Sequence, residues 1–134
     1  MRYLLIYIVT LIACGCKGKT QHIGREPNIQ FLIDQIDNSD CVYFGGVGLA
    51  GENSKIYDCY RTLLKISPDS MWVNLSFNRN QIIRVYAFEA LKKIKSLHLQ
   101  EVRDRLKKDK ATFCYVSDDV KAFFSVCDYV AGSK

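Results

Sequence analysis

Cysteine and histidine are the residue types in this 134-residue chain that could carry out covalent chemistry, and it has six cysteines and two histidines. A cysteine nucleophile needs a base beside it. His98 is the one histidine within the patterned part of the chain, and Cys59 or Cys114 would be its partner. Neither a CxxC pair nor a cysteine–histidine cluster suggests a metal site. Since no set of nucleophile, base and orienting group can be assembled, we predict a protein that is not an enzyme and that uses no metal or cofactor.

The glycine-rich segment Gly45–Gly51, with the sequence GGVGLAG, is a second candidate site. Its residues Gly46–Gly51 match the spacing of the dinucleotide-binding fingerprint, and Asp69 follows at about the distance of the ribose-binding acid. The helical period begins only near Ser54, however, and the chain has too few strand candidates for a βαβαβ sheet. We therefore interpret the segment as a structural turn that lets two helices approach closely. A small ligand-binding protein or enzyme that uses Gly46–Gly51 is the alternative.

The N-terminus carries the most specific signal in the chain. Met1-Arg2 is a short positive start, and the apolar run Leu4–Ile12 that follows is too short to span a bilayer, so it indicates a processing segment. The motif Leu11-Ile12-Ala13-Cys14 resembles the lipobox of bacterial lipoproteins. That resemblance implies cleavage after Ala13 and diacylglycerol on the Cys14 sulfur, which would anchor the protein in the bacterial cell envelope, at the outer membrane. An ordinary secretory leader is the alternative.

The chain therefore divides into a signal peptide at 1–13, a flexible polar tether at 14–27 and one domain at 28–134. A location outside the cytoplasm permits disulfides. Three pairings are possible for the four cysteines of the domain, which are Cys41, Cys59, Cys114 and Cys127. We favour Cys114–Cys127, because a hairpin strand and the helix after it are easily brought together. Cys41–Cys59 would close the glycine loop onto its helix. Free cysteines buried as small apolar residues are the alternative.

Apolar residues at helical spacing predict a series of helices up to about residue 108, after which the period changes to two. The expected elements are helices at Asn28–Asp37, Ser54–Ile66, a short stretch after Ser67-Pro68, Gln81–Lys95 and His98–Lys108, then a hairpin of Ala111–Val116 with Val120–Phe124 and a final helical turn from Ser125 through Val130.

The helix expected at Gln81–Lys95 has apolar residues on two sides, with Val85 and Phe88 opposite the main stripe, so we predict that it lies between neighbours in a stack. Its pattern Ile83-Arg84-x-Tyr86-Ala87-x-x-Ala90-Leu91 looks like the second helix of a HEAT-type repeat, a resemblance that covers roughly 53–107. It implies a mainly α fold: a compact HEAT-like α-α stack of about two helix pairs, with a short C-terminal β-hairpin and a final helical turn. The chain is also similar to small uncharacterised lipoproteins of Bacteroides-like bacteria.

Charge provides the last indication of function. The net charge of +5 is too small to indicate nucleic acid, and no aromatic residues are interleaved with the basic ones on the exposed side of the helices around residues 92–110. We expect a membrane-anchored, non-catalytic protein–protein interaction or scaffold module that binds an envelope protein, with Arg84, Glu89 and Lys92 facing the partner. An immunity or inhibitor protein, whose basic helix would face an acidic site, is the alternative.

Overall fold

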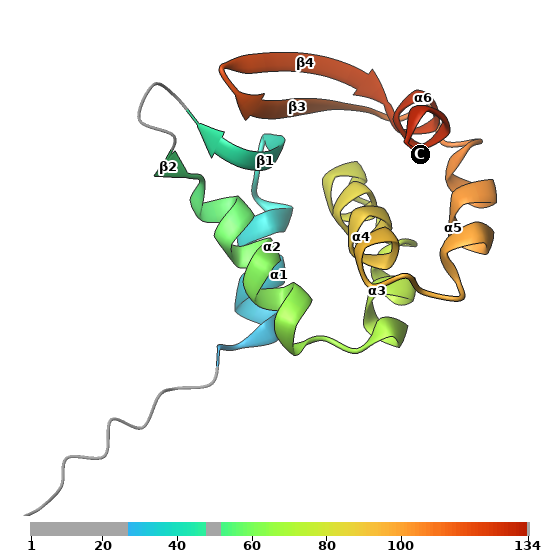
Figure 1. Ribbon diagram of the computed structural model, residues 1–134, viewed down its shortest axis with the longest axis horizontal. Coiled ribbons are helices and arrows are strands. Elements are labelled where there is room, and N and C mark those ends of the chain that lie inside the picture. Colours follow the sequence, from blue (N-terminus) through green and yellow to red (C-terminus); the bar gives the residue numbers. More distant parts are fainter. Residues whose placement is uncertain (1–26, 48–51, 134) are drawn as a thin grey trace, which may run out of the picture.

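The computed structural model describes residues 27–47 and 52–133 (Figure 1). The predicted signal peptide, lipidation site and most of the tether lie outside the described residues, as do residues 48–51 of the glycine-rich segment. The elements in chain order are α1 Ile29–Asp37, β1 Cys41–Val47, β2 Glu52–Asn53, α2 Lys55–Ile66, α3 Asp69–Leu75, α4 Gln81–Lys93, α5 Leu99–Leu106, β3 Thr112–Asp118, β4 Val120–Ser125 and α6 Val126–Gly132. Within these residues, no helix has both the length and the apolar character that a membrane crossing requires.

The strands form one mixed sheet in the order β2-β1-β3-β4. Strands β1 and β3 are parallel, and β2 and β4 flank them as antiparallel neighbours. Because parallel strands cannot be joined by a tight turn, the chain between β1 and β3 makes a long crossover that contains α2 to α5. Figure 1 shows the sheet at the top of the molecule, with α1 to α4 beneath it and α6 beside the end of the β3–β4 hairpin.

This architecture corrects the predicted fold class, because the domain is a mixed α/β fold and not a HEAT-like helical stack with a terminal hairpin. The hairpin is part of a larger sheet, which it shares with β1. The apolar run at Cys41–Phe44 is the start of β1, and the strand continues through Gly45 and Gly46 to Val47, where we expected a turn between helices. Glycine is depleted in strands, so this half of β1 carries no strand signal. The HEAT-like pattern reflects a helix buried on several sides and not a repeat.

Gly45 explains how the strand tolerates this composition. Its φ angle is 81°, in the left-handed region that favours glycine, and it lies where the register between β1 and β3 shifts, between Tyr43 and Val47. We infer that Gly45 permits a bulge in β1 at this register shift.

Helix α4 is the centre of the core, which confirms the prediction of a helix with apolar residues on two sides. Its buried residues are Ile82, Ile83, Val85, Tyr86, Ala87, Phe88, Ala90 and Leu91. Helices α1, α3, α5 and α6 and strands β1 and β3 all pack against it (Figure 1). Helix α2 also contacts α4, since the rings of Tyr60 in α2 and Tyr86 are stacked with their centres 4.8 Å apart.

Three helices begin directly after a residue whose side chain caps the first turn. Asn28, Ser54 and Asn80 each accept hydrogen bonds from backbone N–H groups in the first turn of α1, α2 and α4. The predicted C-terminal features are confirmed as well: β3 and β4 form the hairpin, and Ser125 caps α6 by accepting from the N–H of Asp128. Helix α3, in contrast, starts after Pro68 without a side-chain cap.

Candidate interaction site on strand β4

Strand β4 forms one edge of the sheet. It pairs with β3 from Thr112↔Ser125 to Ser117↔Val120, and no other described strand lies beside it. The backbone N–H and C=O groups that point away from β3 therefore have no strand partner among residues 27–47 and 52–133. Such an edge can pair with a strand of another chain, and proteins usually protect it with charged residues or proline. Lys121 is the only charged residue in this strand.

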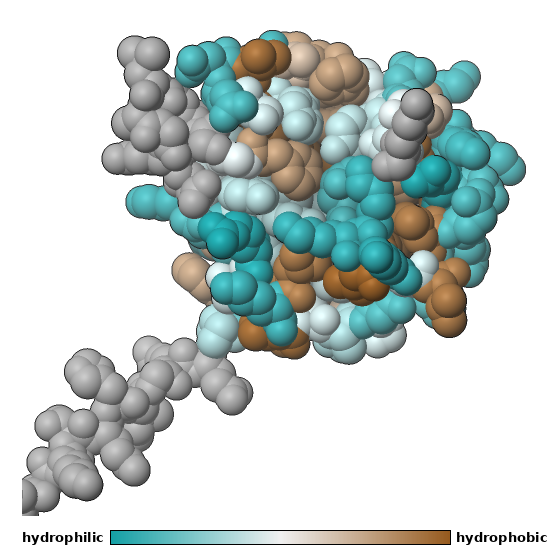
Figure 2. All heavy atoms as spheres, in the orientation of Figure 1, coloured by the Kyte–Doolittle hydropathy of each residue, from teal (hydrophilic) through white to brown (hydrophobic). Residues whose placement is uncertain are grey.

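Exposed apolar side chains lie on this edge strand. Phe123 is 72% exposed, Val120 62% and Phe124 38%. Figure 2 shows apolar side chains along the upper edge of the molecule, where Figure 1 places β3 and β4. Since side chains alternate along a strand, Phe123 lies on one face of the sheet and Val120 and Phe124 lie on the other. A neighbouring strand would contact apolar residues on both faces.

A cluster of aromatic rings supports β4 from the helical side. The Phe124 ring lies 5.9 Å from Tyr115 and 6.1 Å from Tyr129, measured between ring centres. The cluster continues from Tyr115 to Phe44 at 5.8 Å and from Phe44 to Tyr86 at 5.4 Å. These packed rings hold one face of the strand in place while its edge and the Phe123 ring stay open to solvent.

A disulfide joins Cys41 in β1 to Cys114 in β3, with the two Cα atoms 4.5 Å apart. The predicted pairings Cys114–Cys127 and Cys41–Cys59 are therefore wrong. The reason is the parallel pairing of β1 and β3, which places Cys41 directly opposite Cys114 although 73 residues separate them in sequence. No local pattern indicates that pairing.

The two remaining cysteines of the described chain are free. Cys127 lies in α6, with its Sγ atom 3.1 Å from the Ser125 hydroxyl. Burial, aided by the charge of Asp58, raises the pKa of the Cys59 thiol, which disfavours the reactive thiolate.

The residues weighed for catalysis are not brought together. His98 lies just before α5 and is exposed, with its Nδ1 atom 3.9 Å from Oε2 of Glu101. Cys114 cannot supply a thiolate because it is in the disulfide. Asp69, weighed as a ribose-binding acid, accepts a hydrogen bond from the Ser96 hydroxyl at 2.9 Å. Among the described residues, no group of three potential metal ligands is close enough to hold an ion.

The predicted partner-facing residues are occupied within the chain. Arg84 donates through Nε to Asp109 at 2.7 Å and through Nη1 to the carbonyls of Asn78 and Arg79. Its side chain is 14% exposed, so it ties α4 to the turn before it and to the end of α5.

Glu89 is similarly occupied and 14% exposed. It accepts a hydrogen bond from the Tyr129 hydroxyl at 3.1 Å and forms an ion pair with Lys92 at the same distance. Of the three predicted residues, Lys92 is the most accessible, at 32%. The residues that the structure exposes for contact are instead on β4, and sequence reasoning missed them because an edge position depends on strand order.

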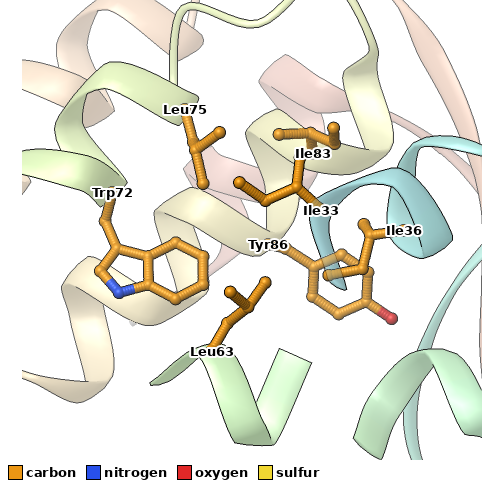
Figure 3. Close-up of a pocket in the computed structure, with 7 residues that line it drawn as sticks. All are labelled: Ile33, Ile36, Leu63, Trp72, Leu75, Ile83 and Tyr86. Atoms are coloured by element: carbon orange, nitrogen blue, oxygen red, sulfur yellow. The ribbon is translucent and has the colours of Figure 1, made fainter. Parts of the chain in front are cut away.

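An apolar cavity of about 10 Å³ lies between α1, α2, α3 and α4 (Figure 3). Figure 3 shows aliphatic side chains around it, while the indole nitrogen of Trp72 and the hydroxyl of Tyr86 point away from its centre. A space this small is at the lower limit for one water molecule and offers no polar partners, so it is a packing gap and not a ligand site.

A comparison with known proteins finds neither a protein-family model nor a curated protein that matches this sequence.

Proposed function

We propose that this protein is a bacterial envelope lipoprotein whose folded domain is a non-catalytic module that binds another envelope protein through strand β4. Two features support a location in the bacterial envelope. The first is the lipobox-like motif Leu11-Ile12-Ala13-Cys14. The second is the Cys41–Cys114 disulfide, because disulfides form and persist in the periplasm and at cell surfaces and are rare in the reducing cytosol.

The exposed aromatic edge of β4 is the observation that carries the proposed binding. A partner segment in extended conformation would add a strand beside β4, with affinity from backbone hydrogen bonds and specificity from alternate side chains. Phe123 supplies the largest apolar surface on one face, and Val120 with Phe124 supplies it on the other. Aromatic side chains are the usual anchors of protein interfaces because they bury a large area with little loss of entropy.

A site-specific cross-link tests this function. A photoreactive amino acid at position 121 of the full chain, expressed in its native host, should produce one discrete cross-linked envelope protein. Phe123→Lys should reduce that product at least tenfold, since it places a charge in the proposed contact. Leu97→Lys is the matched control, because Leu97 is 98% exposed but lies between α4 and α5, away from the sheet.

Two results would refute the proposal. The first is a ladder of many weak products in place of a discrete one. The second is equal cross-linking of the wild-type, Phe123→Lys and Leu97→Lys proteins.

A further inference from the structure

A surface groove of about 460 Å³ lies at the turn between α3 and α4 and at the end of α5, on a different element from β4. Its charged lining consists of four cations, Arg79, Arg84, Arg105 and Lys108, and one carboxylate, Asp109. The Phe77 ring adds an apolar portion and is 63% exposed, while Leu106 lies beneath the groove and is buried in the core. The volume is in the range of small-molecule sites, and the lining has a clear excess of positive charge.

Asp109 compensates only one of the four cations. It pairs with Arg84 at 2.7 Å, and within the described residues no carboxylate is within 4.0 Å of the charged nitrogens of Arg79, Arg105 or Lys108. The groove therefore contains three basic groups without an ion-pair partner. Because Arg84 and Asp109 form an ion pair, they line the groove without adding net charge to it.

Arg105 is the best positioned of these groups. Its guanidinium carbon lies 3.3 Å from the centre of the Phe77 ring, and its Nη2 donates to the carbonyl and the hydroxyl of Ser76. These contacts orient the planar group. Desolvation by burial, together with the nearby charge of Arg84, lowers the pKa of Arg105, although Glu101 acts in the opposite direction. A bound anion would relieve this unfavourable environment.

We propose that this groove binds a phosphate group, carried by a soluble phosphate ester or by a lipid headgroup. Arginine guanidinium groups offer paired donors that match phosphate oxygens, and several converging cations suit a dianion better than a single carboxylate. The groove leaves room for the organic group attached to the phosphate, which would contact the exposed Phe77 ring. This inference is independent of the partner proposed for β4.

Titration of the full chain carrying Cys14→Ser, in detergent micelles, tests the site. Calorimetry with glycerol phosphate should show saturable binding. Arg105→Gln should weaken it at least tenfold, and so should Arg79→Gln with Lys108→Gln, whose side chains make no hydrogen bond within the described part of the chain. Arg61→Gln on α2 is the matched control, because it removes the same charge outside the groove and should leave binding unchanged.

A second arm distinguishes the two sources of phosphate. Flotation compares vesicles of phosphatidylglycerol with vesicles of phosphatidylcholine. Arg105-dependent binding to phosphatidylglycerol without binding of glycerol phosphate assigns the site to a lipid headgroup, and the reverse assigns it to a soluble ester. The proposal is overturned if neither probe binds, if succinate binds as tightly as glycerol phosphate, or if Arg61→Gln weakens binding as much as Arg105→Gln.

Discussion

Tyr86 connects the central helix to the sheet through one hydroxyl group. That hydroxyl donates to the carbonyl of Tyr43 at 2.9 Å and accepts from the N–H of Tyr43 at 2.8 Å, so it satisfies both backbone groups of this residue in β1. Within the described residues, strand β2 pairs with Gly46 and Val47 alone, so Tyr43 has no described strand neighbour on that side. The side chain thus takes the place of a missing strand.

We expect Tyr86→Phe to lower the free energy of unfolding by about 2 kcal/mol, because the ring stays buried while two backbone groups lose their partner. Urea unfolding of both proteins measures the difference. Tyr57→Phe is the control, since the Tyr57 hydroxyl has no hydrogen bond within the described chain, and it should change stability by less than about 0.5 kcal/mol. Equal losses in the two variants would contradict the role assigned to the Tyr86 hydroxyl.

Buried tyrosines also predict the response to alkaline pH. Burial raises the pKa of Tyr60, Tyr86 and Tyr129 well above the ordinary value of 10.0. A raised folded-state pKa contributes stability that is fully present below the unfolded pKa and is lost as pH rises above it.

The free energy of unfolding should therefore fall above about pH 10, by up to about 1.4 kcal/mol per pH unit for each of these tyrosines. Unfolding curves between pH 8 and pH 11 provide the test, and Tyr86→Phe should reduce the slope because it removes one of the raised groups. A stability that stays constant up to pH 11 would be the opposite result.

Local patterns predicted the elements whose signals lie within one stretch of sequence. The two-sided burial of α4, the β3–β4 hairpin and the Ser125 cap of α6 all depend on spacing over a few residues. Strand β1 was missed because its second half is glycine-rich, and its pairing with β3 joins residues 73 positions apart at the disulfide. Without β1 in the sheet, a mainly helical fold was the natural interpretation.

The candidate sites were harder to predict for the same reason. The ion pair between Arg84 and Asp109 joins residues 25 positions apart, and no periodicity connects them. Without that pairing, Arg84 reads as a residue that faces a partner. The strand Val120–Phe124 was predicted correctly, but its place at the edge of the sheet depends on the strand order. The charged groove likewise combines the α3–α4 turn with the end of α5, which only the packing of α5 against α4 brings together.

The disulfide between β1 and β3 gives a prediction about how these strands are held. Cys41→Ala with Cys114→Ala should lower the free energy of unfolding by about 4 kcal/mol, because the bond closes a loop of 73 residues and so restricts the unfolded chain. Urea unfolding without reductant measures the loss. Cys59→Ala with Cys127→Ala is the control, since both thiols are free and only partly buried.

Peptide mapping under non-reducing conditions checks the same assignment directly. It should recover Cys41 linked to Cys114 and should find Cys59 and Cys127 open to alkylation in the unfolded protein. A linked peptide that contains Cys127 would contradict the assignment of Cys127 as a free thiol.

The two proposed contact surfaces have different physical requirements. Strand β4 offers backbone groups and aromatic side chains, so binding there should depend weakly on salt. The groove beside α5 offers cations, so binding there should weaken as ionic strength rises. A protein held at a membrane by its N-terminus could use both at once, with a partner on β4 and phosphate at the groove.

That arrangement depends on the lipid anchor, which yields the last prediction. Metabolic labelling with radioactive palmitate should mark the wild-type protein, and Cys14→Ala should abolish the label, because the lipobox resemblance places the lipid on that sulfur. Cys16→Ala is the matched control and should keep the label, since Ala13 stands three positions before it where Leu11 precedes Cys14. Label that survives Cys14→Ala would refute the anchor, while the disulfide, β4 and the groove would stand as separate claims.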